Sequence, residues 1–318
     1  MSHPVKPIDL NGISTYSLSD RPSKVNTGSF ARPWTTGGRW IDFIDRLPHV
    51  LAGDDLRAVI ESVAVAHHRK RTVLMGMGAH VIKVGLNPIV TDLMRRGVLS
   101  AVAMNGAGII HDLEVALAGK TSEDVAAALG SGAFGMARET ADHINAAVRD
   151  AGAAGIGLGL AVGRRIADLE MPFADQSILC AGFRHNVPVT VHVALGTDIV
   201  HMHPGFDPAA AGAASHRDFR IFASVAATLQ DGVYLNVGSA VVLPEVFLKA
   251  ITLVRNLGHP VSRLTTVNID FIRHYRPMTN VVNRPTLQGG RGISLVGHHE
   301  ILLPLIAAGV IERIDGCG

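Results

Sequence analysis

Histidine and lysine side chains follow two apolar runs that end in glycine, and their types suit proton transfer. The run VLMGMG (73–78) leads to His80 and Lys83, and the run AVAMNGAG (101–108) leads to His111. Glycines at strand ends let the backbone approach a ligand, and the helix that follows offers unpaired N–H groups. Lys83 lies among apolar residues, so it can act as a base, as an imine-forming nucleophile or as an anion-binding cation.

Several turns have the composition of a phosphate- or ribose-binding site. The segments NGAG (105–108) and GSAVV (238–242) each follow an apolar run, and Asn268 and Asp270 end the run LTTVNID. Two such turns in one parallel sheet favour an extended ligand along its carboxyl edge. Each is also compatible with an ordinary strand-to-helix connection, and neither has GxGxxG spacing. The candidate cofactor-binding residues are His80, Asn105, Gly106, Ala107, Gly108, Asp112, Thr197, Asp198, Gly238, Ser239, Asn268 and Asp270.

The segment GTDIVHMHP (196–204) concentrates polar residues after another apolar run. Its His-x-His pair places two imidazoles on one side of an extended chain, which suits a metal ion. A third ligand would come from the later segment GHHE. A polar pocket without a metal is the favoured interpretation. The alternative divalent-metal ligands are His201, His203, His298, His299 and Glu300.

The elements that must position these residues alternate along the chain. Segments with helical spacing of apolar residues separate five strand-like runs, at 73–78, 101–108, 187–195, 232–238 and 264–270. This alternation predicts parallel βαβ units in one α/β sheet. Residues 1–38, which are polar, predict an N-terminal arm, and residues 39–318 predict a single α/β domain. The segment 274–300 is expected to be loop-like before a last helix.

Composition disfavours several classes of protein. The 318-residue chain has a net charge of +2 and dispersed basic residues, so nucleic acid is not an expected partner. No apolar run approaches the ~20 residues of a membrane helix. Cys180 and Cys317 are too few for a disulfide framework, and the N-terminus lacks a signal-peptide pattern, so we expect a cytoplasmic protein. The expected partner is a small-molecule substrate.

Four stretches resemble segments of the deoxyhypusine synthase family. GAHVIKVGLNPIVTDLMRRGVLSAVAMNGAGIIHDLEVAL (78–117) resembles the family's Asn-containing loop and Thr-Ala-Gly-Gly strand end, and DGVYLNVGSAVV (231–242) its Gly-Gly-Gly-Val-Val turn. TTVNID (265–270) and NRPTLQGGRG (283–292) resemble its Ile-Asn-Thr-Ala strand and Ala-Arg-Pro segment. The resemblance covers roughly residues 70–300. It implies a Rossmann-like parallel sheet flanked by helices that binds NAD, and a homotetramer with active sites between subunits.

The chain departs from this family at the residues that carry the family's reaction. Gly290-Arg291-Gly292 replaces the segment with the imine-forming lysine, and Leu243-Pro244-Glu245 replaces the one with the proton-handling histidine. Ile110 and His111 replace its paired glutamates. The resemblance therefore implies a retained cofactor site, a reaction other than deoxyhypusine synthesis, and a neutral or anionic substrate.

We therefore predict an NAD-dependent enzyme of the deoxyhypusine synthase-like fold, an oxidoreductase or transferase that removes a hydride from an alcohol or amine carbon. A histidine would be the general base at neutral pH. The alternatives are a metal-dependent hydrolase or lyase and a non-catalytic nucleotide-binding protein. The candidate catalytic residues are Lys83, His111, His201, His203 and Arg291.

Overall fold

Six strands form one parallel sheet in the computed structural model, which describes residues 5–316. Their order is β3-β2-β1-β4-β5-β6, so the fold is the predicted Rossmann-like α/β class. All residues of β1 and β4 are buried, as expected for strands covered by helices on both faces. The strands are β1 Val73–Met77, β2 Ala101–Asn105, β3 Val189–His192, β4 Val233–Val237, β5 Thr265–Asp270 and β6 Arg291–Val296.

The central strand β1 sets the position of the candidate site. It pairs with β2 on one side, with Met77 opposite Met104, and with β4 on the other, with Met77 opposite Val237. The loops after β1, β2 and β4 therefore leave the sheet at the same edge. Because the chain order reverses between β1 and β4, the crevice between their loops is where this class of fold binds ligands.

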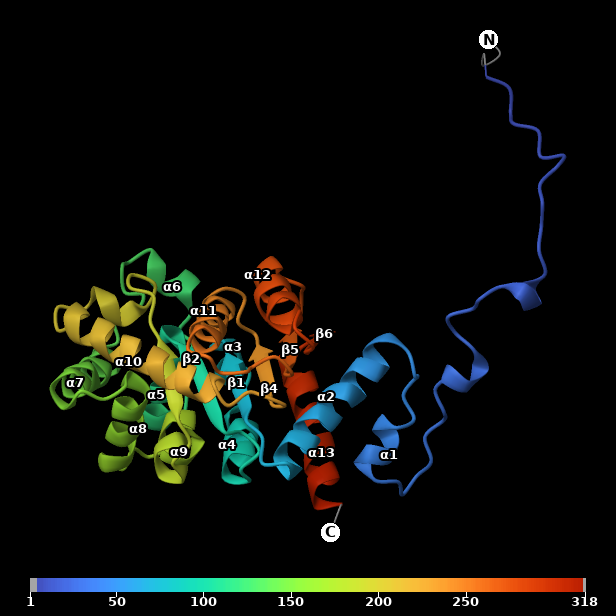
Figure 1. Cartoon of the computed structure of the whole chain (residues 1–318). Helices are drawn as coiled ribbons and strands as arrows, with labels where there is room; N and C mark the ends of the chain where they lie inside the picture. The colour runs from blue at the N-terminus through green and yellow to red at the C-terminus, as the bar shows by residue number, and fades with distance from the viewer. Residues whose placement is uncertain (1–4, 317–318) are drawn as a thin grey trace.

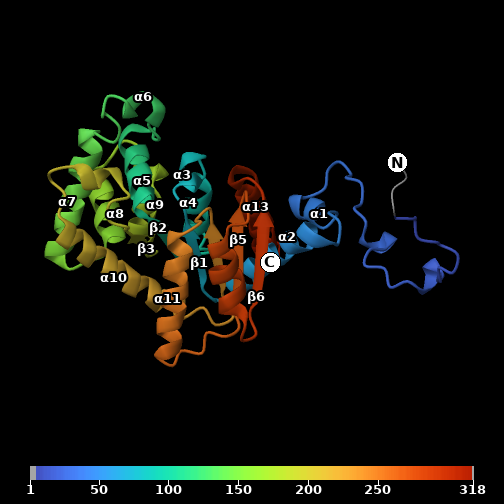
Figure 2. The ribbon, with the colours of Figure 1, turned by 90° about the horizontal axis from the view of Figure 1, so that it is seen from above.

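Helices cover both faces of the sheet (Figures 1 and 2). The helices α2, α4 and α13 pack into the larger apolar core, while α10 and α11 pack on the opposite face around Tyr234, Phe222 and Phe247. No helix in residues 5–316 is both long and apolar enough to cross a bilayer. The α-helices are α1 Trp40–Ile44, α2 Leu51–His68, α3 His80–Lys83, α4 Asn87–Arg95, α5 Gly106–Ala118, α6 Val125–Leu129, α7 Arg138–Ala154, α8 Leu158–Asp168, α9 Ile178–His185, α10 Pro208–Ala226, α11 Val242–Asn256, α12 Tyr275–Pro277 and α13 His299–Asp315.

Short helical turns complete the connections. One of them, η5, is a π-helix, and the others are 3-10 turns. They are η1 Leu18–Asp20, η2 Thr27–Ser29, η3 Ala174–Gln176, η4 Ile199–Met202, η5 Met278–Asn283 and η6 Arg284–Thr286.

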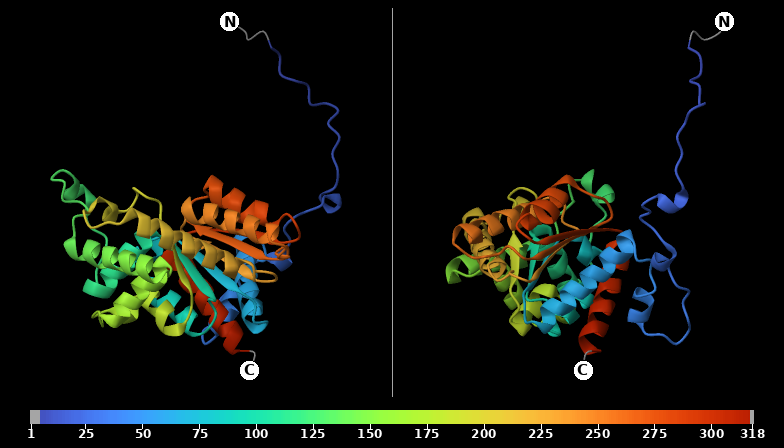
Figure 3. Two further views of the ribbon diagram at one scale, coloured as in Figure 1. Left: turned by 60° about the vertical axis from the view of Figure 1, so that its left-hand side comes forward. Right: turned by 45° about the vertical axis from the view of Figure 1, so that its right-hand side comes forward.

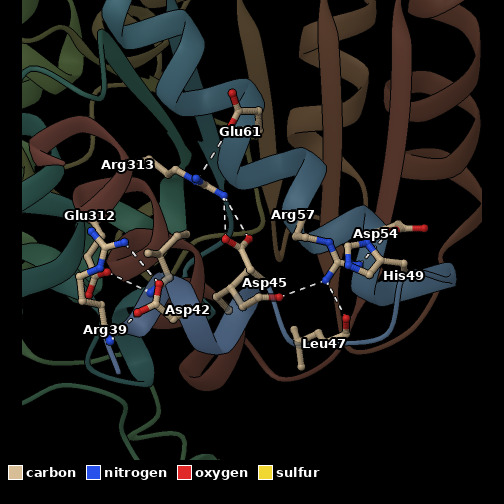
Figure 4. A network of polar contacts seen from close by, with 12 residues as sticks. Arg39, Asp42, Asp45, Leu47, His49, Asp54, Arg57, Glu61, Glu312 and Arg313 are labelled. Atoms are coloured by element: carbon tan, nitrogen blue, oxygen red, sulfur yellow. Dashed lines mark hydrogen bonds and ion pairs between the residues drawn. The ribbon is translucent and has the colours of Figure 1, made fainter. Parts of the chain in front are cut away.

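The N-terminal segment extends away from the body of the molecule (Figure 3). Almost every residue from 5 to 38 is exposed, and α1 begins at Trp40. Polar contacts to α13 fix α1 in place (Figure 4): Glu312 accepts the backbone N–H groups of Trp40 and Ile41 at 3.0 Å each, and Arg313 pairs with Asp45 at 3.1 Å. The extended segment is therefore held at its base. Residues 1–4 of the predicted arm and Cys317 lie outside the described range.

One strand lies where the sequence predicted a loop. β6 is in the glycine-rich stretch QGGRGISLVG, and that part of the prediction was wrong. Only Ile293 and Leu295 of this strand are buried, so the apolar alternation is too short to be recognised. Pairing along the whole length of β5 forms the strand, which is a tertiary effect.

Candidate functional site

Two glycines bring the loops after β1 and β4 into backbone contact. A Cβ atom on Gly78 would lie 2.1 Å from the carbonyl oxygen of Gly238. Gly238 has φ +65°, and a Cβ there would lie 2.9 Å from the ring of His299. Only glycine permits this approach at both positions. The two glycine turns therefore meet at the topological switch point, which is where parallel sheets of this strand order bind ligands.

The turn after β2 is closed by a carboxylate of the chain itself. The Asn105 side chain caps α5 by accepting the N–H of Gly108 at 3.1 Å. A Cβ on Gly106 would lie 1.8 Å from Oδ2 of Asp198, so this carboxylate packs directly on the first residue of α5. Burial raises the pKa of Asp198 above its usual value. With a carboxylate in this position, the turn is better suited to a hydroxyl or ammonium group than to a phosphate.

A cavity of about 820 Å³ lies beside this turn, between α5, the α6 region and η4. We call it the α5 cavity. Five of the predicted site residues line it, and they come from three different strand ends: Lys83, Ala107, His111, Thr197 and Asp198. Its remaining wall combines apolar and acidic side chains with a second lysine: Ile110, Glu114, Leu117, Lys120, Thr121, Glu123, Val125, Phe134, Glu139, Thr140 and Ile199 among others.

His111 belongs to a chain of hydrogen-bonded side chains in this cavity. Its Nδ1 lies 2.6 Å from the hydroxyl of Thr121, which donates to Oε2 of Glu114 at 2.5 Å. The other oxygen of Glu114 accepts the hydroxyl of Thr140 at 3.1 Å. Burial lowers the pKa of His111 below its usual value, Glu114 opposes this shift and Lys83 adds to it. A neutral imidazole at pH 7 can accept a proton, so the geometry suits a general base.

His201 and His203 have local partners in the loop after β3. Nδ1 of His201 accepts the backbone N–H groups of Gly196 and Asp198 at 3.0 and 3.3 Å, and its Nε2 lies 3.7 Å from the Asp198 carboxylate. Nε2 of His203 contacts the carbonyl of Gly135 at 2.8 Å. His201 thus orders the loop that carries Asp198, while His203 connects η4 to the segment before α7.

A second polar group lies beyond the ends of β5 and β6. The buried carboxylate of Asp270 lies 3.8 Å from Nε2 of His299 and 3.9 Å from Nε2 of His274. His299 also contacts the carbonyl of Ile269 at 3.2 Å, and its ring centroid lies 5.5 Å from that of His80. Burial lowers the pKa of His299. The predicted residues His80 and Asp270 therefore lie together on the β4–β6 side of the crevice.

Asn268 and Ser239 support the turn after β4. The side-chain amide of Asn236 donates to Oδ1 of Asn268 at 2.8 Å and to the carbonyl of Ser239 at 2.9 Å. The Ser239 hydroxyl accepts the N–H of Leu243 at 3.2 Å in the first turn of α11. Asn268 and Ser239 are both buried, so they support the turn from beneath and are not exposed to a ligand.

Asp112 is buried away from the α5 cavity. Its carboxylate accepts the N–H groups of Ile178 and Leu179 at 2.8 and 3.1 Å and the Ser177 hydroxyl at 2.5 Å. Asn87 donates to it as well, at 3.1 Å. Burial raises the pKa of Asp112 to about 6, and these hydrogen bonds oppose the shift. Its position is that of a cap for α9, so the structure does not bring it to the switch point between β1 and β4.

Arg291 also lies apart from the other candidates. It is the first residue of β6, while the crevice and the α5 cavity lie at the carboxyl ends of the strands. The length of β6 separates Arg291 from that edge by about 16 Å. The prediction that it takes part in catalysis therefore finds no support in its position within this chain.

The alternative metal ligands are not brought together. His201 and His203 follow β3 at one end of the sheet, and the other three follow β6 at the opposite end. Five strand spacings amount to about 24 Å. Within residues 5–316, no group of three or more His, Cys, Asp or Glu side chains is placed to hold a metal ion. The structure therefore separates His201 and His203 from the other three candidate ligands, His298, His299 and Glu300.

Three residues of the hydrogen-bonded chain were not predicted. Glu114 follows His111 by three positions on α5, and this spacing on a helix is a pattern that sequence reasoning could have used. Thr121 and Thr140 reach the same carboxylate only because α5 ends at Gly119 in the left-handed conformation and the chain turns back. That contact has no sequence pattern.

Comparison with known proteins supports the fold. No family model and no curated protein sequence matches this chain. It is similar to the structure of ArgZ, an arginine dihydrolase from the ornithine-ammonia cycle in cyanobacteria, with TM-score 0.51 and 17% identity over 81% of this chain and 31% of ArgZ. It is also similar to AgrE in a ternary complex with ornithine and NAD+, with TM-score 0.51 and 15% identity over 86% of this chain and 35% of AgrE.

A deoxyhypusine synthase-like protein from Entamoeba histolytica has the same fold, with TM-score 0.50 and 10% identity over 88% of this chain and 96% of that protein. This chain spans about a third of the length of ArgZ and AgrE. At these identities the similarity establishes the fold, and the predicted deoxyhypusine synthase-like architecture is confirmed at that level.

Proposed function

We propose that this protein is an NAD-dependent enzyme that acts on a small molecule, as an oxidoreductase or a transferase with a hydride-transfer step. The observation that carries the proposal is the topological switch point between β1 and β4, where parallel sheets of this order bind dinucleotides and where the loops after both strands turn at Gly78 and Gly238. The AgrE neighbour was crystallised with NAD+ in the same fold. His80 and Asp270 would contact the cofactor on one side, and Asn105 to Gly108 on the other.

The bound dinucleotide would supply a hydride acceptor, and residues of the α5 cavity would handle the accompanying proton. As a hydride leaves a carbon that bears a hydroxyl or amine, the O–H or N–H proton passes to a base and a C=O or C=N bond forms. His111 is half-buried, has a pKa lowered below its usual value and lies in the cavity wall, so it is the base that the geometry favours. Lys83 would bind an anionic group of the substrate.

The charges of the cavity refine the expected substrate. Four carboxylates and two lysines line it, so a ligand with groups of both signs fits better than a simple anion. AgrE was crystallised with ornithine, which has this character. We therefore propose a small zwitterionic substrate in place of the neutral or anionic one that the replaced residues suggested. The four carboxylates are Glu114, Glu123, Glu139 and Asp198.

Titration calorimetry of the purified full chain with NAD+, NADH, NADP+ and NADPH tests the cofactor. We expect micromolar binding of one dinucleotide pair, and loss of most of that binding in Gly78→Ala. Gly85→Ala is a poor control because Gly85 has φ +76°, so the matched control is Gly212→Ala on α10, where an added Cβ meets nothing within 4 Å. Absence of binding at millimolar concentrations of all four dinucleotides would overturn the proposal. Binding without reduction of NAD+ by any zwitterionic substrate would favour a non-catalytic nucleotide-binding protein.

A further inference from the structure

The position of protons in the α5 cavity follows from a count of donors. Thr121 has one hydroxyl proton, and it is donated to Glu114 at 2.5 Å. An ionised carboxylate only accepts, so it offers no proton in return. The Thr121 oxygen, 2.6 Å from Nδ1 of His111, is then left to accept. The proton of the neutral imidazole must therefore lie on Nδ1.

We propose that Glu114 and Thr121 hold His111 in the Nδ1–H tautomer, so that its Nε2 carries the lone pair that accepts protons in the α5 cavity. Among the described residues Nε2 makes no hydrogen bond, so it is free to receive one. Neutral histidine in water prefers the opposite tautomer, with the proton on Nε2. The side chains of Glu114 and Thr121 are thus positioning residues for His111. The tautomer is a property of the protein alone, and only its use in a reaction rests on the proposed function.

The surrounding structure fixes the positions of the hydrogen-bonded side chains of His111, Thr121 and Glu114. Glu114 and His111 share one face of α5 at a spacing of three residues, and Thr140 of α7 holds the second carboxylate oxygen. Thr121 follows Gly119, whose left-handed conformation reverses the chain at the end of α5. Contacts from α5, from the turn after it and from α7 therefore fix one carboxylate, which in turn fixes the hydroxyl and the imidazole.

The tautomer restricts what the cavity can bind at Nε2. A lone pair accepts a hydrogen bond from a hydroxyl or an ammonium group, and it repels a carbonyl or carboxylate oxygen. The carboxylates of Asp198 and Glu139 also line this cavity, and they too favour a donor group. We therefore expect the reacting group of the substrate to be an alcohol or amine that donates to Nε2 of His111.

Long-range ¹H–¹⁵N NMR of the full chain labelled with ¹⁵N-histidine tests the tautomer directly. The His111 signals are assigned from their loss in His111→Gln. Above the pKa of His111, we expect a protonated Nδ1 and an unprotonated Nε2. In Thr121→Val this preference should be lost, and in Thr121→Ser it should be kept. Signals of the other histidines report that each variant is folded.

Two results would overturn the inference: a wild-type His111 with its proton on Nε2, or a Thr121→Val spectrum in which His111 keeps the wild-type tautomer. Neither depends on NAD, so a failure of dinucleotide binding leaves the inference intact and the reverse also holds.

Glu114→Gln provides a second measurement. The amide oxygen can still accept from Thr121, so the tautomer should persist. Removal of the charge should lower the pKa of His111, because Glu114 raises it. The midpoint of the His111 titration, read from the same spectra, should fall relative to wild type, while Glu139→Gln, which removes a charge that makes no contact with His111, should shift it less. An unchanged midpoint in Glu114→Gln would contradict the role of that carboxylate.

Discussion

At the scale of single residues, Gly106 at the start of α5 leaves no room for a side chain beside the carboxylate of Asp198. Gly106→Ala would place a Cβ 1.8 Å from Oδ2 of Asp198, so the loop after β3 must move. We expect a loss of about 1–3 kcal/mol in the free energy of unfolding, as for other overpacked sites. Chemical denaturation measures it. Gly212→Ala is the control and should raise stability by up to about 1 kcal/mol, because Gly212 lies within α10 and its added Cβ meets nothing.

Asp218 gives stability a definite dependence on pH. It accepts the N–H groups of Gly159 and Val191 at 3.0 and 2.9 Å, and burial raises its pKa to about 7. The folded state thus binds this proton more tightly than the unfolded state. The contribution of Asp218 to the free energy of unfolding is greatest below about pH 4 and is lost as pH rises to about 7.

The measurement compares wild type with Asp218→Asn across this range by urea denaturation. The stability of wild type relative to the variant should fall as pH rises, by an amount on the order of a few kcal/mol. The difference is needed because His192 has the opposite effect: burial lowers its pKa to about 3, so its contribution is lost as pH falls below about 6.5. A difference that does not change with pH would show that Asp218 does not titrate there.

At the scale of elements, the segment between α5 and α7 forms one wall of the α5 cavity and is held at two points. Near the start of this segment, Thr121 donates a hydrogen bond to Glu114 of α5. Near the end of the segment, the carbonyl of Gly135 contacts His203. His203→Ala removes the second contact, worth about 0.5–1.5 kcal/mol. We expect faster amide hydrogen exchange in residues 122–136 with no change in β1. Equal exchange in wild type and variant would show that His203 does not hold this wall.

The elements also show what the sequence could and could not predict. Strands β1 to β5 were predictable, because each is a buried and mostly apolar run followed by a polar or glycine-containing turn. β6 was not, since pairing with β5 forms it. Within the site, the strand-end residues Lys83 and Asp198 were predicted and do meet in one cavity. Asp112 was predicted to bind the cofactor, and the structure places it as a cap of α9, whose N-terminus lies 66 residues later in the chain.

At the scale of the whole molecule, the N-terminal segment contributes little to the fold of one chain. Nine large apolar side chains between Val5 and Trp34 are at least 45% exposed. Removal of residues 1–28, which keeps the carbonyl of Ser29 that accepts the N–H of His49, should leave the free energy of unfolding unchanged within about 0.5 kcal/mol. Glu312→Ala, which removes the acceptor for the first N–H groups of α1, should cost about 1–2 kcal/mol.

The same truncated protein tests the predicted homo-oligomer. Light scattering of the full chain and of the truncated chain at matched concentrations measures the mass of each. We expect the full chain to be larger than one protomer, because so many apolar side chains in an extended segment favour burial against a partner. A monomeric full chain would contradict the homotetramer that the family resemblance implies.

The order of the strands places the switch point where the two halves of the sheet join. β1 to β3 come from residues 73–192 and β4 to β6 from residues 233–296, and within the sheet the two halves meet only through the pair β1–β4. A ligand bound across the loops that follow β1 and β4 would therefore contact both halves and resist their separation. At a concentration one hundred times its dissociation constant it would add about 2.7 kcal/mol to the free energy of unfolding. A ligand bound at this switch point would in this way make the two halves unfold together, at a higher temperature than in the ligand-free protein.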